Sequence, residues 1–177
     1  MPTNGGLIGK ENLPLQQGRT KVTSFTSSGN FTISPNNTLG TADVLVVAGG
    51  GGGGSDVGGG GGAGGYKVSS SHPMPANDIT VTVGAGGAKN GTVGANSVFA
   101  SASSPITSTG GGGGGNYPNG DGDAGGSGGG GSGHPGANQT TAGGAASPSG
   151  QGNAGGSSGP IANTPALLTT GGGGGGS

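Results

Sequence analysis

The chain contains no cysteine and no tryptophan, and charged residues make up only 6% of its 177 positions. Without cysteine there is no disulfide framework, so any fold must be stabilised without covalent cross-links. With 3 phenylalanines and 2 tyrosines as its aromatic residues, the chain has little material for a large apolar core. We therefore expect most of the stabilising free energy to come from main-chain hydrogen bonds or from partner chains.

Positive charge is also scarce. The net charge is −1, and the basic residues are Lys10, Arg19, Lys21, Lys67 and Lys89. Phosphate binding depends on clustered lysine and arginine, so no nucleic-acid partner is expected. Nowhere does the chain show about 18 consecutive apolar residues, and no membrane insertion is expected. Residues 1–10 lack the basic and apolar regions of a signal peptide, which predicts a protein made in the cytoplasm and not exported by a classical route.

Glycine is abundant instead, with 53 residues, and it is concentrated in tracts. The longest cover residues 49–54, 58–65, 110–115, 125–133 and 171–176. Consecutive glycines exclude collagen, which requires glycine at every third position. Such tracts are either disordered or ordered by main-chain bonding alone, because glycine loses much backbone entropy and buries no side chain. The ordered form is the polyglycine-II helix, whose N–H and C=O groups all bond to neighbouring chains.

Short apolar runs of β type lie between the tracts. Residues 22–33 predict two strands with a turn, the continuous run 44–48 is typical of a strand buried on both faces, and 79–83 alternates strictly. The last two pass into glycine with no turn residue between, so the extended direction should continue. The expected fold class is all-β: a small N-terminal β module continuing into a polyglycine-II helix bundle, with few or no α-helices.

We expect three regions along the chain. Residues 1–20 form an arm, 21–109 a β-rich module with interleaved glycine tracts, and 110–177 a polyglycine-II-like region. The arm has apolar residues with nothing local to bury against, and we expect it to dock through Leu7, Ile8, Lys10 and Leu13. The alternative for the arm is a frayed terminus, since chain ends are disordered by default.

Candidates for chemistry are few, and neither an enzyme nor a cofactor is expected. Asn119, Asp121 and Asp123 stand at alternate positions, as ligands of a calcium loop do. Ala124 replaces the glycine that such a loop needs at its sixth position, and Gly130 stands where a bidentate glutamate belongs, which favours a solvated turn. His72 and His134 have no second ligand at metal-binding spacing, so no zinc site is predicted.

Close backbone packing has a mutational consequence. Since glycine-to-glycine contacts leave no room for a Cβ atom, Gly51→Val and Gly112→Val are predicted to abolish folding of the bundle. Gly120→Ala, in a predicted loop, should be nearly silent.

The order of segments resembles a known family. The stretches TSFTSSGNFTI (23–33), ADVLVVAGGGGGG (42–54) and ITVTVGAGG (79–87) resemble the glycine-rich domain of tail and fibre proteins of tailed bacteriophages, especially marine ones. The opening GLIGKENLP (6–14) is similar to the segment that begins many phage virion proteins. Residues 109–177 resemble in composition the polyglycine-II adhesins of some enteric phages.

The resemblance implies a virion structural protein located in the virion, a tail- or capsid-attached fibre or appendage that contacts other virion proteins through residues 1–20. Because phage fibres are commonly threefold, it also implies a homo-oligomer, with a trimer favoured over the monomer that the adhesin-like half would permit. Strand residues 22–33, 44–48 and 79–83 carry apolar side chains on more than one face, which predicts an oligomer interface within 21–109.

Two other function classes remain open. A receptor-binding adhesin would present loops to a host surface molecule, with candidate residues His72, Met74, Asn116, Tyr117 and Asn119. The third class is a free structural or ice-binding glycine bundle. An ice binder needs a regular face of threonine or similar residues, but the threonines here cluster in the predicted strands.

Overall fold

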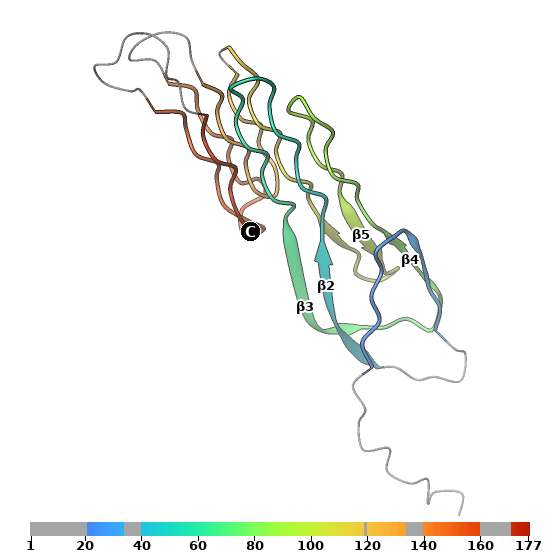
Figure 1. Cartoon of the computed structure of the whole chain (residues 1–177). Helices are drawn as coiled ribbons and strands as arrows, with labels where there is room; N and C mark the ends of the chain where they lie inside the picture. The colour runs from blue at the N-terminus through green and yellow to red at the C-terminus, as the bar shows by residue number, and fades with distance from the viewer. Residues whose placement is uncertain (1–20, 34–39, 119, 134–139, 160–170) are drawn as a thin grey trace, which may run out of the picture.

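The computed structural model describes residues 21–33, 40–118, 120–133, 140–159 and 171–177. These residues form an elongated molecule with a β module at one end and a bundle of extended glycine-rich segments at the other (Figure 1). Within the described ranges there is no helix, so the predicted all-β class is confirmed. It follows that this part of the chain also offers no helix able to cross a membrane.

Two small antiparallel sheets make up the β module. Its strands are β1 (Gly29–Phe31), β2 (Thr41–Val47), β3 (Tyr66–Pro73), β4 (Ile79–Thr82), β5 (Ser97–Ala100) and β6 (Ile106–Ser108). One sheet has the order β1-β4-β5-β6, and the other pairs β2 with β3. Because successive side chains of a strand point to opposite faces, each sheet can turn one face toward the other.

The apolar core is small and consists of side chains from both sheets. Its buried members are Ile33, Val46, Ile79, Phe99 and Ile106. Such a core matches the shortage of large apolar residues in the sequence. This core lies within the β module and stabilises only that part of the molecule. The glycine bundle therefore needs another source of stability.

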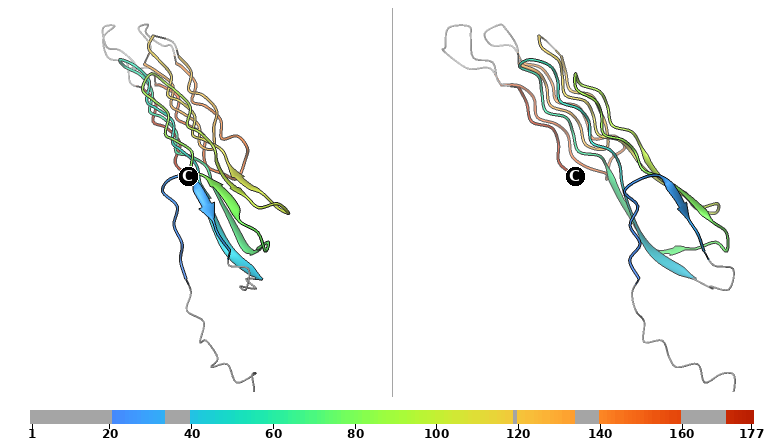
Figure 2. Two further views of the ribbon diagram at one scale, coloured as in Figure 1. Left: turned by 90° about the vertical axis from the view of Figure 1, so that its right-hand side faces the viewer. Right: turned by 45° about the vertical axis from the view of Figure 1, so that its right-hand side comes forward.

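Glycine segments continue the strands directly, and this confirms the predicted junctions after residues 48 and 83. Residues 48–54 continue β2, 58–65 lead into β3, 84–88 continue β4, 91–96 lead into β5, and 109–115 continue β6. Figure 2 shows the extended course passing from arrow to tube without a bend in several of these places. The β module thus sets the starting positions of the first half of the bundle.

The bundle contains ten extended segments within the described residues. They are 48–54, 58–65, 84–88, 91–96, 109–115, 120–126, 127–133, 140–146, 151–159 and 171–177. Successive segments run in opposite directions along the bundle (Figures 1 and 2). The sequence predicted a boundary between two regions at residues 109 and 110, and this point is where β6 passes into its glycine segment. Glycine segments that precede the boundary and glycine segments that follow it pack together in the same bundle.

Hydrogen bonds recur at every third residue, as in polyglycine II. The N–H groups of Gly51 and Gly54 donate to the carbonyls of Gly62 (2.8 Å) and Gly59 (2.9 Å). Gly49 and Gly52 donate to a different segment, at Ala95 (3.1 Å) and Thr92 (2.8 Å). A helix with three residues per turn returns each third N–H to the same side, so every segment bonds to several neighbours at once. The predicted polyglycine-II bundle is therefore confirmed.

The packing of the segments is hexagonal. Segment 127–133 lies at the centre of a complete hexagon and shares hydrogen bonds with six others: 58–65, 109–115, 120–126, 140–146, 151–159 and 171–177. Each of its N–H groups donates to a main-chain carbonyl, and most of its carbonyls accept from main-chain N–H groups; the Ser132 carbonyl accepts from the hydroxyl of Thr141. Main-chain bonding takes the place of an apolar core in this half of the molecule.

Close approach of backbones explains the glycine content. A Cβ atom at Gly51 would lie 2.0 Å from the carbonyl oxygen of Gly112, and one at Gly112 would lie 2.0 Å from that of Asp123. The expected tolerance of Gly120 is wrong, because a Cβ atom there would lie 2.4 Å from the backbone nitrogen of Asn116. Gly120 begins a bundle segment and packs against the turn before it, so this position also requires glycine.

Candidate functional site

The end of the bundle opposite the sheets is built from the turns between glycine segments (Figure 1). We define the tip as the described residues Ser55, Asp56, Val57, Lys89, Asn90, Gly91, Asn116, Tyr117 and Pro118. Three separate turns contribute to it. Each turn reverses the chain between antiparallel segments, so the bundle itself holds the tip in place.

One side chain links the three turns. The Oδ1 atom of Asn116 accepts hydrogen bonds from the backbone N–H of Ser55 (2.9 Å) and from its hydroxyl (3.2 Å). The Nδ2 atom of Asn116 donates to the carbonyl of Asn90 (3.2 Å). The N–H of Tyr117 also donates to the carbonyl of Ser55 (3.4 Å). These bonds order the tip before any partner arrives, which lowers the entropic cost of binding.

The backbone at the tip adopts left-handed conformations that suit tight turns. Asp56 and Asn90 have positive φ values of 54° and 68°, and Gly91 has one of 73°. Asparagine, aspartate and glycine are the residues that tolerate this region best. The turns are thus short and well defined, a geometry that presents Asp56, Asn90 and Lys89 to solvent.

The chemistry available at the tip is that of a recognition surface. Its exposed groups include one carboxylate, one ammonium, amides, the apolar side chains of Val57 and Pro118, and the partly exposed ring of Tyr117. Among the residues that the structure describes, no group of three or more His, Cys, Asp or Glu side chains is placed to hold a metal ion. Hydrogen bonding and weak charge pairing with a partner are what this arrangement can supply.

The predicted recognition residues are divided between the two ends of the molecule. Asn116 and Tyr117 lie at the tip, and Asn119 lies outside the described residues. Met74 is half-buried against the core of the β module, at the other end. Sequence reasoning missed Ser55 and Asn90, which only the fold brings beside Asn116.

The loop position predicted for His72 is wrong. His72 lies in β3, is 2% exposed, and packs edge-on against Phe99 with ring centroids 5.7 Å apart. Its Nδ1 atom lies 3.2 Å from the hydroxyl of Ser69, and its Nε2 atom has no partner among the described residues. The pairing of β2 with β3 is irregular just before this point, where Ser71 adopts a φ of 52°. Such bulges re-aim side chains, and here the imidazole turns into the core.

The calcium candidates do not form a closed loop. Asp121 and Asp123 both belong to the straight segment 120–126, and Asn119 lies outside the described residues. The Oδ1 atom of Asp121 accepts a hydrogen bond from the backbone N–H of Ala142 (2.7 Å), so this carboxylate supports the bundle. The docking candidates Leu7, Ile8, Lys10 and Leu13 also lie outside the described residues.

The outer surface of the β2–β3 sheet is apolar and exposed. We call it the apolar face; it consists of Leu45, Val47, Tyr66 and Val68, which are between 43% and 63% exposed. Leu45 lies directly opposite Val68, and Val47 opposite Tyr66, so the four side chains form one patch. Burial of residues 44–48 on both faces was therefore a wrong prediction for a single chain, since only Val46 and Ala48 are buried.

A family model described as a glycine-rich domain matches residues 26–177. The match spans nearly the whole chain, which therefore belongs to this glycine-rich domain family. No curated protein and no solved structure matches the chain.

Proposed function

We propose that this member of the glycine-rich domain family is a bacteriophage virion structural protein, a fibre or appendage attached to the tail or capsid through residues 1–20. The observation that carries the proposal is the polarity of the molecule. The segment 21–33, which follows the arm, lies at the sheet end, whereas the tip lies at the far end of the bundle (Figures 1 and 2). A chain held by residues 1–20 would project its glycine bundle away from the particle.

The bundle suits an external appendage. Its stability comes mainly from backbone hydrogen bonds, supplemented by a few buried serine and threonine hydroxyls, and it needs neither disulfides nor a large apolar core. A six-residue segment spans about 19 Å, so the bundle holds the tip about that far from the sheets. The sequence resemblance to phage tail and fibre proteins supplies the link to a virion.

The exposed apolar face supports the same proposal. The apolar face exposes four large side chains on a rigid two-stranded sheet, and exposed apolar patches mark interaction sites. We propose that copies of this chain cover it, as a homo-oligomer in which a trimer is the expected form. Residues 21–109 would then carry the interface, in agreement with the position of β2 and β3.

Deletion of residues 1–20 tests the attachment. The full-length and truncated proteins are expressed in infected host cells, particles are purified on a density gradient, and copy number is measured by quantitative mass spectrometry. We expect the truncated protein to stay folded and oligomeric but to disappear from particles. Incorporation of the truncated protein at normal copy number, or absence of the full-length protein from particles, contradicts the proposal.

A second candidate function, a receptor-binding adhesin, is favoured by the order that Asn116 gives to the tip. Its test is binding of fluorescently labelled soluble protein to host cells. Loss of binding in Lys89→Glu, with binding retained in the matched Lys67→Glu variant in β3, would favour the adhesin. If the protein is incorporated into particles but does not bind host cells, the adhesin function is excluded and only the structural role remains.

A further inference from the structure

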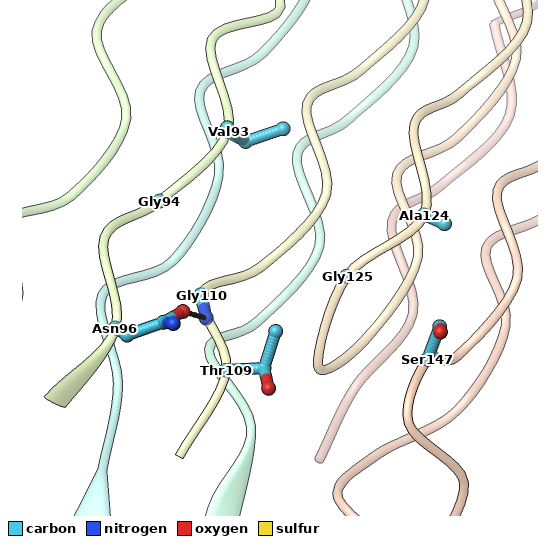
Figure 3. A pocket seen from close by; sticks show the side chains of 8 residues that line it. All are labelled: Val93, Gly94, Asn96, Thr109, Gly110, Ala124, Gly125 and Ser147. Atoms are coloured by element: carbon cyan, nitrogen blue, oxygen red, sulfur yellow. Dashed lines mark hydrogen bonds between the residues drawn. The ribbon is translucent and has the colours of Figure 1, made fainter. Parts of the chain in front are cut away.

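A groove runs along one side of the bundle near its junction with the sheets. It encloses a cavity of about 240 Å³. Val93 and Asn96 line one wall, Gly110 the floor, and Ala124 the other wall, with Ser147 at the lower end (Figure 3). The Oδ1 atom of Asn96 accepts a hydrogen bond from the N–H of Gly110 (2.9 Å), which leaves its amide nitrogen on the groove side. The lining contains no charged residue.

The hydrogen-bond pattern shows that this groove is a position in the hexagonal packing that none of the described segments occupies. Segment 109–115 forms the floor and bonds to five others, which follow one another around it: 91–96, 48–54, 58–65, 127–133 and 120–126. Each of the five bonds to the next in this order, except that 120–126 and 91–96 share no bond. The sixth position, between those two segments, is the groove. A segment lying there would meet three others.

The opposite edge of the bundle has the complementary shape. Segment 171–177 bonds to 58–65, 127–133 and 151–159, which lie side by side, so its other three sides face away from the described bundle. A Cβ atom at Gly173 or at Gly176 would meet no atom within 4 Å. The segment carries no side chain before Ser177. It is therefore a bare ridge of backbone, with hydrogen-bonding positions that no other described segment fills.

We propose that segment 171–177 of one copy occupies the groove of a second copy. A ridge with three open sides then meets a groove that offers three neighbours, and the hexagon around the inserted segment is complete. Its own flanking segments, 58–65 and 151–159, come to lie against 91–96 and 120–126 of the second copy. In this arrangement no segment of one copy takes a position that a described segment of the other copy holds. The proposed contact therefore extends the same hexagonal packing from one bundle into the next.

The occupant is a second copy because its ridge is already ordered. A free glycine peptide would lose its backbone entropy on entering the groove, whereas the ridge has lost it on folding. Three contacts by the ridge and two by its flanks, each about 19 Å long and about 5 Å wide, bury on the order of 1,000 Å² in total, the lower range of specific interfaces. Every copy has both groove and ridge, so this contact is head-to-tail and open-ended.

Engineered disulfides test this contact, since the chain has no cysteine of its own. We combine Ala124→Cys in the groove with either Gly173→Cys or Gly176→Cys on the ridge. The two ridge positions are one helical turn apart, so the two pairs test two ways in which the ridge could be shifted along the groove. The two sites lie on opposite edges of one copy and cannot join within it. On oxidation we expect a ladder of dimers, trimers and larger species on a non-reducing gel. Ala124→Cys alone should give dimers at most.

The matched control is Ala145→Cys with Gly173→Cys, because Ala145 is an exposed alanine outside the groove. All variants are first shown to keep the circular dichroism spectrum and melting temperature of the parent. Absence of a ladder from both groove pairs, or an equal ladder in the control, would overturn the proposal. The ladder should persist when Leu45→Ser and Val68→Ser are added, because these substitutions change the apolar face and not the groove. Loss of the groove contact can therefore be told apart from loss of the apolar-face oligomer and from loss of attachment to particles.

Discussion

The hexagonal packing predicts that two glycines in the same tract respond oppositely to alanine. A Cβ atom at Gly51 would lie 2.0 Å from the carbonyl oxygen of Gly112, whereas one at Gly53 would have the carbonyl oxygen of Gly59 as its nearest neighbour, at 3.8 Å. Gly51→Ala must therefore push two segments apart. Gly53→Ala makes only an ordinary contact. The pair is matched in chemistry, tract and distance from the sheets.

The magnitude follows from the bonds that cross the affected contact. To relieve the clash, segments 48–54 and 109–115 must separate by at least about 1 Å, which breaks hydrogen-bond geometry. Two bonds join them, from Gly111 to Gly49 and from Gly114 to Gly52, both 2.9 Å. An unmade buried bond costs about 1–3 kcal/mol, so Gly51→Ala should lose about 2–6 kcal/mol of unfolding free energy. Gly53→Ala should gain up to about 1 kcal/mol, because alanine restricts the unfolded chain.

Thermal unfolding followed by circular dichroism measures the difference. At about 2–4 °C per kcal/mol for a chain of this size, Gly51→Ala should lower the melting temperature by roughly 4–24 °C. Gly53→Ala should leave it unchanged or raise it by up to about 4 °C. Equal melting temperatures for the two variants would refute close backbone packing and favour a flexible glycine linker.

Three further predictions concern side chains. Leu45→Ser with Val68→Ser should keep the fold but lower the oligomer mass in sedimentation velocity, because both side chains are more than 60% exposed. Thr141→Val should cost about 1–3 kcal/mol in denaturant unfolding, since the buried hydroxyl bonds to the Ser132 carbonyl and Ser158 hydroxyl. His72→Leu should keep or raise the melting temperature, because it removes a buried nitrogen that has no partner among the described residues; a large loss would contradict this account of the core.

Sequence reasoning succeeded where a local pattern has a direct physical consequence. Six consecutive glycines have no side chain to bury, so an ordered tract can only bond through its backbone, and this predicted polyglycine II. The direct passage from Ala48 to Gly49 predicted that β2 continues as a glycine segment. The shortage of large apolar residues predicted a small core and a fold held mostly by main-chain bonds.

Sequence reasoning failed where the outcome depends on distant neighbours. The continuous apolar run of residues 44–48 could not show that Leu45 stays exposed, because only the placement of the second sheet decides which face is covered. His72 looked like a loop residue beside two prolines, but an irregularity in the pairing of β2 with β3 turns it into the core. Gly120 looked like part of a turn, yet it begins a bundle segment.

The sequence by itself therefore determined the class of structure: extended strands, glycine segments that continue them, and bonding by backbone. Tertiary structure alone decided which segments are neighbours, which glycines tolerate a side chain, and where the hexagonal packing leaves a groove. The physical reason is that identical glycines carry no side chains to encode a partner. Their neighbours are set by the strands and turns at the segment ends, through contacts between residues far apart in the chain.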